Sequence, residues 1–328
     1  MSPAVAENPS PPASYADFSD AEKGGWLRTA VQFFAIPLLI VSVAVAIWFG
    51  ANLMVGSGPS SAADFVELLQ SDTINRRWQA AFELARRLQG AEVPAEFRDP
   101  RLTATLGSAL TRARADAGDD ARLACTILGI LGRLADPASL PAVRGALDDP
   151  HPWIRSYAVR ALGGLGDRES APRLRELASH EDPGTRQAAL AVLAQFDVVE
   201  GVSTRLSPET RTLAVQHLSD PKEDVRFTAA LVLARAGEGE AALPVLGRML
   251  DRAYLEQFGM DATLTGISRY QLHSNLILRA IEAVERIDAR NDEGILRGLQ
   301  QRSLAEHEGD QQVRSAAQRV LKAWHTKD

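Results

Sequence analysis

The stretch DPHPWIRSYAVRALGGLGD, residues 149–167, carries the pattern that organises most of this chain. It opens with Asp149-Pro150, a pair that caps or closes a turn, because proline is excluded from a helix interior. The apolar residues that follow recur at helical spacing and form one stripe; they are Ile154, Ala158, Ala161, Leu162 and Leu165. The glycines near its end, Gly163, Gly164 and Gly166, are expected to end the helix. The stretch therefore predicts an amphipathic helix between two turns.

Four other stretches of the chain follow the same pattern. They are NRRWQAAFELARRLQG from residue 75, DPGTRQAALAVLAQFD from 182, DPKEDVRFTAALVLARAGE from 220 and GDQQVRSAAQRVLKAW from 309. A second helical segment lies between successive copies, so each unit is predicted to be helix, turn, helix, with a period in the thirties. One pair alone cannot bury its apolar stripe, and neighbouring pairs are therefore expected to stack.

The predicted fold is all-α, a right-handed α-solenoid of about seven helix pairs over residues 61–328, preceded by one transmembrane helix. Runs of alternating Val, Ile, Thr and Tyr that would indicate strands are missing from the sequence. The two helices of each pair are expected at 61–70/73–89, 99–116/119–134, 137–147/151–165, 168–179/183–195, 207–218/222–236, 239–252/271–288 and 292–305/310–325.

The segments DPHPWIRSYAVRALGGLGDRESAPRLREL and DPKEDVRFTAALVLARAGEGEAALPVLGRML resemble HEAT repeats, more narrowly the short bacterial HEAT-like repeats of the phycobilisome-lyase type. The resemblance covers roughly residues 60–326. It implies a solenoid whose second helices line the concave face, and an Asp/Arg ladder in which recurring arginines bond the turn aspartates. The arginines are Arg77, Arg155, Arg186, Arg226 and Arg314, and the aspartates are Asp149, Asp182 and Asp220. The alternative is that the arginines form a basic ladder for an anionic partner.

The sequence predicts no catalytic residue, no cofactor and no metal site. Deoxyhypusine hydroxylases are built on similar repeats and hold two irons through His-Glu pairs just after the repeat arginine. Here those positions hold other residues, and the dipeptides His180-Glu181 and His307-Glu308 precede the arginine, in predicted turns. No GxxxxGK[ST], HExxH, GxSxG or CxxC motif occurs. The only cysteine, Cys125, lies in an apolar run and is expected to be buried. The net charge of −6 disfavours a nucleic-acid partner.

The first sixty residues are predicted to lie outside the repeat region. Residues 1–28 are rich in Pro, Ser and Ala and are expected to be a disordered tail. Residues 29–55 are predicted to form a transmembrane signal-anchor helix, because no charged residue occurs from Val31 to Val55. Residues 56–60 follow as a linker. Lysine and arginine near the N-terminal end favour a single-pass protein of the bacterial inner membrane, with its N-terminus in the cytoplasm and the solenoid outside.

An irregularity in the repeat and a set of aromatic residues suggest how the protein binds a partner. Residues 253–270 form an insertion that carries Tyr254, Phe258, Met260 and Tyr270, and it is either a docking loop or a loop packed on the solenoid. Trp153 and Tyr157, with Trp78, lie on or at the start of second helices. These residues predict a non-catalytic, membrane-anchored scaffold or adaptor that binds a protein partner associated with the membrane. The alternative is an accessory subunit or a lyase- or oxidoreductase-like protein.

Overall fold

The computed structural model describes residues 33–35, 37–49, 59, 61–115, 121–197, 205–257, 268–304 and 310–326. The chain divides into two units, Met1–Ser60 and Ser61–Asp328. Within the described ranges the regular structure is helical throughout and contains no strand.

The second unit is a row of seven helix pairs over its described residues. The pairs are α2 (Ala62–Gln70) with α3 (Ile74–Arg87), α4 (Pro100–Ala115) with α5 (Arg122–Leu134), α6 (Leu140–Arg144) with α7 (Pro152–Leu165), α8 (Ala171–Leu177) with α9 (Pro183–Asp197), α10 (Pro208–His217) with α11 (Glu223–Arg235), α12 (Leu243–Leu250) with α14 (Arg269–Arg286) and α15 (Glu293–Ser303) with α16 (Gln311–His325). The short helix α13 (Arg252–Gln257) lies between the two helices of the sixth pair. The all-helical repeat solenoid is thus confirmed.

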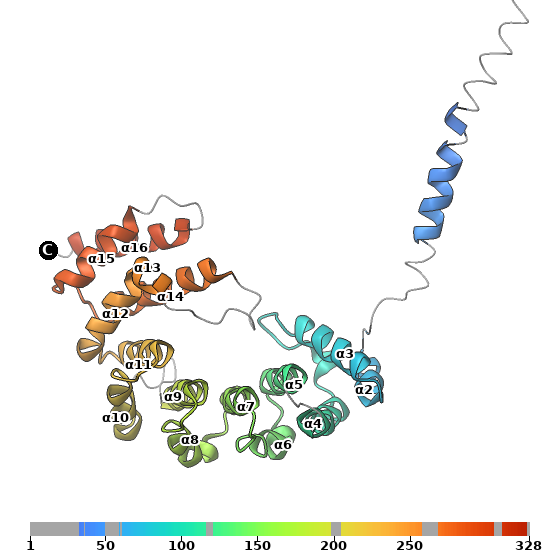
Figure 1. Ribbon diagram of the computed structural model, residues 1–328, viewed down its shortest axis with the longest axis horizontal. Helices are drawn as coiled ribbons and strands as arrows, with labels where there is room; N and C mark the ends of the chain where they lie inside the picture. The colour runs from blue at the N-terminus through green and yellow to red at the C-terminus, as the bar shows by residue number, and fades with distance from the viewer. Residues whose placement is uncertain are drawn as a thin grey trace, which may run out of the picture. The chain divides into compact units, whose positions relative to one another are not determined.

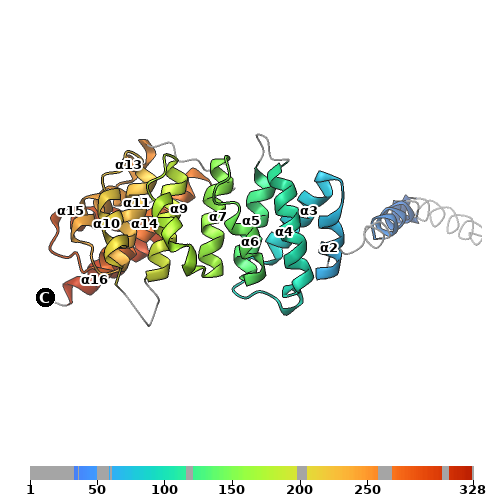
Figure 2. The same cartoon turned by 90° about the horizontal axis from the view of Figure 1, so that it is seen from below.

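Successive pairs stack along a curved row, and the second helices lie on its inner side (Figure 1). Figure 2 shows the helices of neighbouring pairs standing side by side. The predicted stripe of α7 is buried, since Ile154, Ala158 and Leu162 have no exposed surface. Two clusters of buried apolar residues meet at α9, which gives Leu193 to one and Leu190 to the other. Neighbouring pairs therefore bury their apolar residues against one another, as stacked repeats require.

The glycines of α7 do not all end the helix. Gly166 does, because it has a φ of +67°, the left-handed conformation that glycine adopts without strain. Gly163 and Gly164 lie inside α7, where the packing of neighbouring second helices excludes a side chain. A Cβ on Gly164 would lie 2.3 Å from the carbonyl oxygen of Gly132 on α5. The interpretation of all three glycines as a helix stop was wrong for these two, whose role is close helix packing.

The prediction of a transmembrane helix over residues 29–55 is wrong. No helix in the described part of the chain is both long and apolar enough to span a bilayer. The predicted single-pass inner-membrane localisation, with its orientation, fails for the same reason. The predicted tail 1–28 lies outside the described residues, as does the predicted linker 56–60 except for residue 59.

Candidate functional site

The recurring arginine is the fourth residue of its second helix, in α3, α7, α9, α11 and α16. From that position it reaches back over the turn that precedes the helix. In three pairs its Nη1 donates to the carbonyl oxygen six residues earlier: Arg155 to Asp149 at 2.7 Å, Arg186 to His180 at 2.9 Å, and Arg226 to Asp220. The arginine thus satisfies a carbonyl group that the turn leaves without a helical partner.

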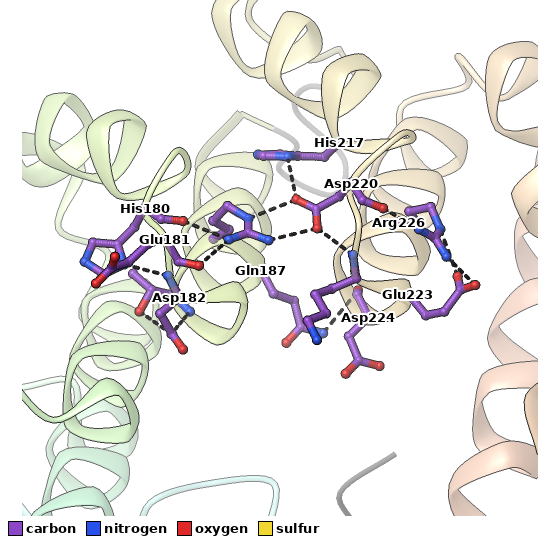
Figure 3. Close-up of polar contacts among 12 residues, drawn as sticks. His180, Glu181, Asp182, Gln187, His217, Asp220, Glu223, Asp224 and Arg226 are labelled. Carbon is purple, nitrogen blue, oxygen red and sulfur yellow. Dashed lines mark hydrogen bonds and ion pairs between the residues drawn. The ribbon is translucent and has the colours of Figure 1, made fainter. Parts of the chain in front are cut away.

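Arg186 also connects its own pair to the next one through Asp220, which is labelled in Figure 3. Its Nε and Nη2 donate to the two carboxylate oxygens of Asp220, at 2.9 Å each. The two side chains are 11% and 4% exposed. Burial of Asp220 opposes ionisation, but the bonds from Arg186 and from the amide of Lys222 outweigh it, so the pKa of Asp220 lies below its usual value. This buried ion pair joins α9 to the turn between α10 and α11.

Asp182 does not belong to this ladder. The residue that corresponds to Asp149 and Asp220 is His180, because each lies six residues before its arginine. The Asp182 carboxylate instead accepts from the amide and the hydroxyl of Thr185, at 2.7 Å each. It closes the first turn of its own helix, so the alignment of Asp-Pro dipeptides placed it in the wrong register.

Two pairs lack the recurring arginine and replace it with another one. The fourth residue of α5 is Cys125, and that of α14 is Leu272. In both cases an arginine from elsewhere in the pair reaches the turn aspartate of the next pair: Arg114 to Asp149 at 2.7 Å, and Arg252 to Asp310. The buried turn aspartates Asp149, Asp220 and Asp310 therefore each receive an arginine from the preceding pair, which accounts for these cations within the fold.

The inner side of the first three pairs holds a different feature, which we call the aromatic groove. It is a cavity of about 250 Å³ between α3, α5 and α7, lined by Trp78, Phe82, Arg122, Cys125, Thr126, Trp153 and Tyr157. Trp153 and Tyr157, predicted as partner-binding residues, thus share one site with Trp78. Phe82 was not among the predicted residues, although its spacing of four residues from Trp78 places both rings on one face of a helix.

The rings of the groove are held in place and still accessible. Trp78 and Phe82 stack with centroids 5.4 Å apart, and His151 contacts Trp153 edge-on at 5.6 Å. Phe82 is 55% exposed and Trp153 is 36% exposed. Burial, with Cys125 close by, raises the pKa of the Tyr157 phenol. Cys125 is buried as expected. The groove therefore offers rigid apolar surface to a ligand.

The described ends of the insertion pack on the solenoid. The Tyr254 hydroxyl bonds the carboxylate of Glu223, and the Arg248 guanidinium lies 5.8 Å from the centre of the Tyr254 ring. Leu255 is completely buried. Tyr270 packs against Arg252, whose guanidinium is 4.2 Å from the ring centre. Phe258 and Met260, the other two predicted contact residues of the insertion, lie outside the described residues.

Of the two His-Glu dipeptides, the structure describes His180-Glu181, which lies in the turn between α8 and α9. His180 Nδ1 accepts from the amide of Asp182 at 2.9 Å, and the carbonyls of His180 and Glu181 accept from Arg186 (Figure 3). His307-Glu308 lies outside the described residues. Among those that are described, no three His, Cys, Asp or Glu side chains are grouped closely enough to hold a metal ion.

Comparison with known proteins identifies the repeat. Residues 109–194 and 178–256 match the family model for HEAT repeats. The matched residues therefore contain HEAT repeats, and the repeat predicted from residues 149–167 lies within them. A search of curated proteins found no match.

Two solved structures illustrate what the described fold is similar to. One is the complex of CpcE and CpcF of phycocyanin lyase from Nostoc, with 19% identity over 81% of this chain and 97% of that chain, at a TM-score of 0.47. The other is human deoxyhypusine hydroxylase, with 16% identity over 81% of this chain and 96% of that chain, at a TM-score of 0.34.

Proposed function

We propose that this chain is a non-catalytic scaffold or adaptor that binds a protein partner on the face formed by its second helices, with the aromatic groove as the main contact. The observation that carries the proposal is the gathering of four aromatic side chains around one open cavity of about 250 Å³. Accessible aromatic residues in pockets are the residue type that most often dominates the energy of protein interfaces.

The aromatic residues of α7 are not explained by the repeat. Trp153 lies two residues before the recurring arginine and Tyr157 two residues after it. The corresponding residues are Gly184 and Ala188 in α9, and Asp224 and Thr228 in α11. Since those pairs stack without aromatic side chains there, stacking does not require Trp153 or Tyr157. Tyr157 is half-buried and packs against the core, whereas Trp153 is 36% exposed, so Trp153 is the stronger candidate for binding.

The test compares co-purification from the native cells by a tagged wild-type chain and by the double variant Phe82→Ala/Trp153→Ala. The matched control is Val215→Ala, which removes an apolar side chain that is 47% exposed on a first helix, α10. The scaffold proposal expects the groove variant to lose a specific protein partner that the control keeps, with the melting temperatures of all three chains equal. Unchanged recovery of every partner by the groove variant would refute it.

The insertion 253–270 is proposed as a second contact with the partner. Because Tyr254, Leu255 and Tyr270 pack on the solenoid, a test must leave them in place. Replacing residues 259–266 with a Gly-Ser segment of equal length should weaken co-purification of the same partner without changing the melting temperature. Equal recovery of the partner by the wild type and by this variant would restrict docking to the groove.

The alternative function is an accessory subunit or a lyase-like protein. A chromophore or metal that co-purifies with the chain in place of a protein would favour it.

A further inference from the structure

A second cavity on the second-helix face contains a cluster of arginines. It has a volume of about 240 Å³, lies between α11 and α14, and is lined by Leu231, Arg235, Arg279, Glu282, Ala283 and Arg286. We call it the arginine pocket. All three arginines are exposed. Within the described residues, none of them makes a side-chain hydrogen bond or an ion pair, unlike the arginines that close the turns.

The pocket has an excess of positive charge that the fold does not neutralise. Three arginines face one glutamate, which leaves two positive charges, whereas the whole chain has a net charge of −6. Acidic residues are not scarce, since the chain has 42 of them against 36 basic ones. Like charges close together on neighbouring helices oppose folding. An arginine cluster with a single acid among its lining residues is therefore suited to an anion that comes from outside the chain.

The chemistry of the pocket favours carboxylate groups of a peptide. Guanidinium groups bind carboxylates through two parallel hydrogen bonds. Leu231 and Ala283 add apolar surface against which the aliphatic part of an acidic side chain, or an apolar neighbour, can pack. Glu282 within the pocket and the net negative charge of the chain disfavour a long, continuous polyanion such as nucleic acid more than a short acidic segment.

We infer that the arginine pocket binds the carboxylates of an acidic segment of a protein partner. The inference rests on the proposed function, because it treats this segment as part of the protein that the second-helix face binds. The pocket and the aromatic groove lie on second helices of different pairs, α11 and α14 for one and α3, α5 and α7 for the other. The partner would thus make an ionic contact through its acidic segment in the arginine pocket and an apolar contact in the aromatic groove.

The test measures binding of a fluorescein-labelled peptide, three Glu-Glu-Leu units long, by fluorescence anisotropy at 50 mM salt. The variant Arg279→Gln/Arg286→Gln is compared with Arg76→Gln/Arg101→Gln, which removes two exposed arginines from α3 and α4 and changes the net charge equally. The pocket variant should bind about tenfold more weakly or worse, while the control variant stays within about twofold of the wild type. A peptide with Gln in place of Glu should not bind.

Three outcomes would overturn the inference: no binding of the acidic peptide by the wild type, equal losses in the two variants, or tighter binding of a single-stranded oligonucleotide that the pocket variant loses. The groove variant Phe82→Ala/Trp153→Ala should bind the peptide as the wild type does. If the groove variant keeps its native partner and the pocket variant still loses the peptide, the scaffold proposal fails and the pocket remains an acidic-peptide site. If the groove variant loses its native partner and the pocket variant still binds the peptide, the inference about the arginine pocket is rejected and the scaffold proposal stands.

Discussion

Arg186 and Arg279 lie on second helices of the same solenoid and have opposite surroundings. Arg186 is 11% exposed and bonds the carboxylate of Asp220 and the carbonyls of His180 and Glu181. Arg279 is exposed and has no such partner among the described residues. The first occupies the position where arginine recurs from pair to pair, and the second does not.

The same difference between structural and exposed residues separates the turns from the face formed by the second helices. Residues that recur at fixed positions close turns, pack stripes and join neighbouring pairs. Residues that break the recurrence, such as Trp153, Tyr157 and Arg279, are exposed or half-buried and line cavities. In a solenoid, side chains that stacking does not use are therefore the first candidates for binding, and the predictions below test that separation.

The largest effect is expected from removing the arginine of the buried ion pair. Arg186→Ala leaves the buried Asp220 carboxylate without its partner and should lower the free energy of unfolding by about 3–5 kcal/mol. Its matched control, Arg279→Ala, should stay within about 0.5 kcal/mol of the wild type. Urea denaturation followed by circular dichroism measures both. Equal stability of the two variants would remove the distinction between structural and binding arginines.

A smaller loss in the free energy of unfolding is expected from Gly164→Ala, which adds a methyl group between α5 and α7. The Cβ of Gly164→Ala would lie 2.3 Å from the carbonyl oxygen of Gly132, so the helices must separate, at a cost of about 1–3 kcal/mol. The control Gly129→Ala, also inside a helix, has no atom within 4 Å of its added Cβ. It should gain about 0.5–1 kcal/mol from higher helix propensity. Thermal melts that shift in the same direction for both variants would contradict the close-packing role of Gly164.

The contribution of the ion pair should depend on pH in a defined direction. The pKa of Asp220 is lower in the folded chain than its usual value near 3.8. Its stabilising effect is therefore complete above that value and is lost as the pH falls through the lower folded pKa. The stability gap between the wild type and Asp220→Asn should be largest at pH 7 and should shrink below about pH 4. A gap that stays constant from pH 7 to pH 3 would show that the carboxylate charge does not matter.

Local patterns of the sequence were sufficient for the helices and for part of the site. The helix predicted at 151–165 is α7, Pro152–Leu165, because its stripe, its initial proline and its final glycine are all local signals. The groove residues Trp153 and Tyr157 could be singled out because the repeat does not account for them. Phe82 could have been found from its spacing to Trp78.

Contacts between residues far apart in the chain could not be predicted from local sequence patterns. Arg252 and Asp310 are 58 residues apart, and only stacking brings them together. Asp182 was assigned to the ladder because an Asp-Pro dipeptide is easy to align, whereas the register is set by distance from the arginine.

The central claim is that the aromatic groove on the second-helix face contacts the partner, whereas the first helices, such as α10, do not. The most direct test places a photo-crosslinking amino acid at Phe82 in the aromatic groove and, separately, at Val215 on α10, and irradiates intact cells. Both positions are about half exposed, at 55% and 47%, so they are equally open to reaction. We predict a discrete protein adduct from position 82 and none from position 215. Adducts of the same protein in equal yield from both positions, or from position 215 alone, would contradict the account.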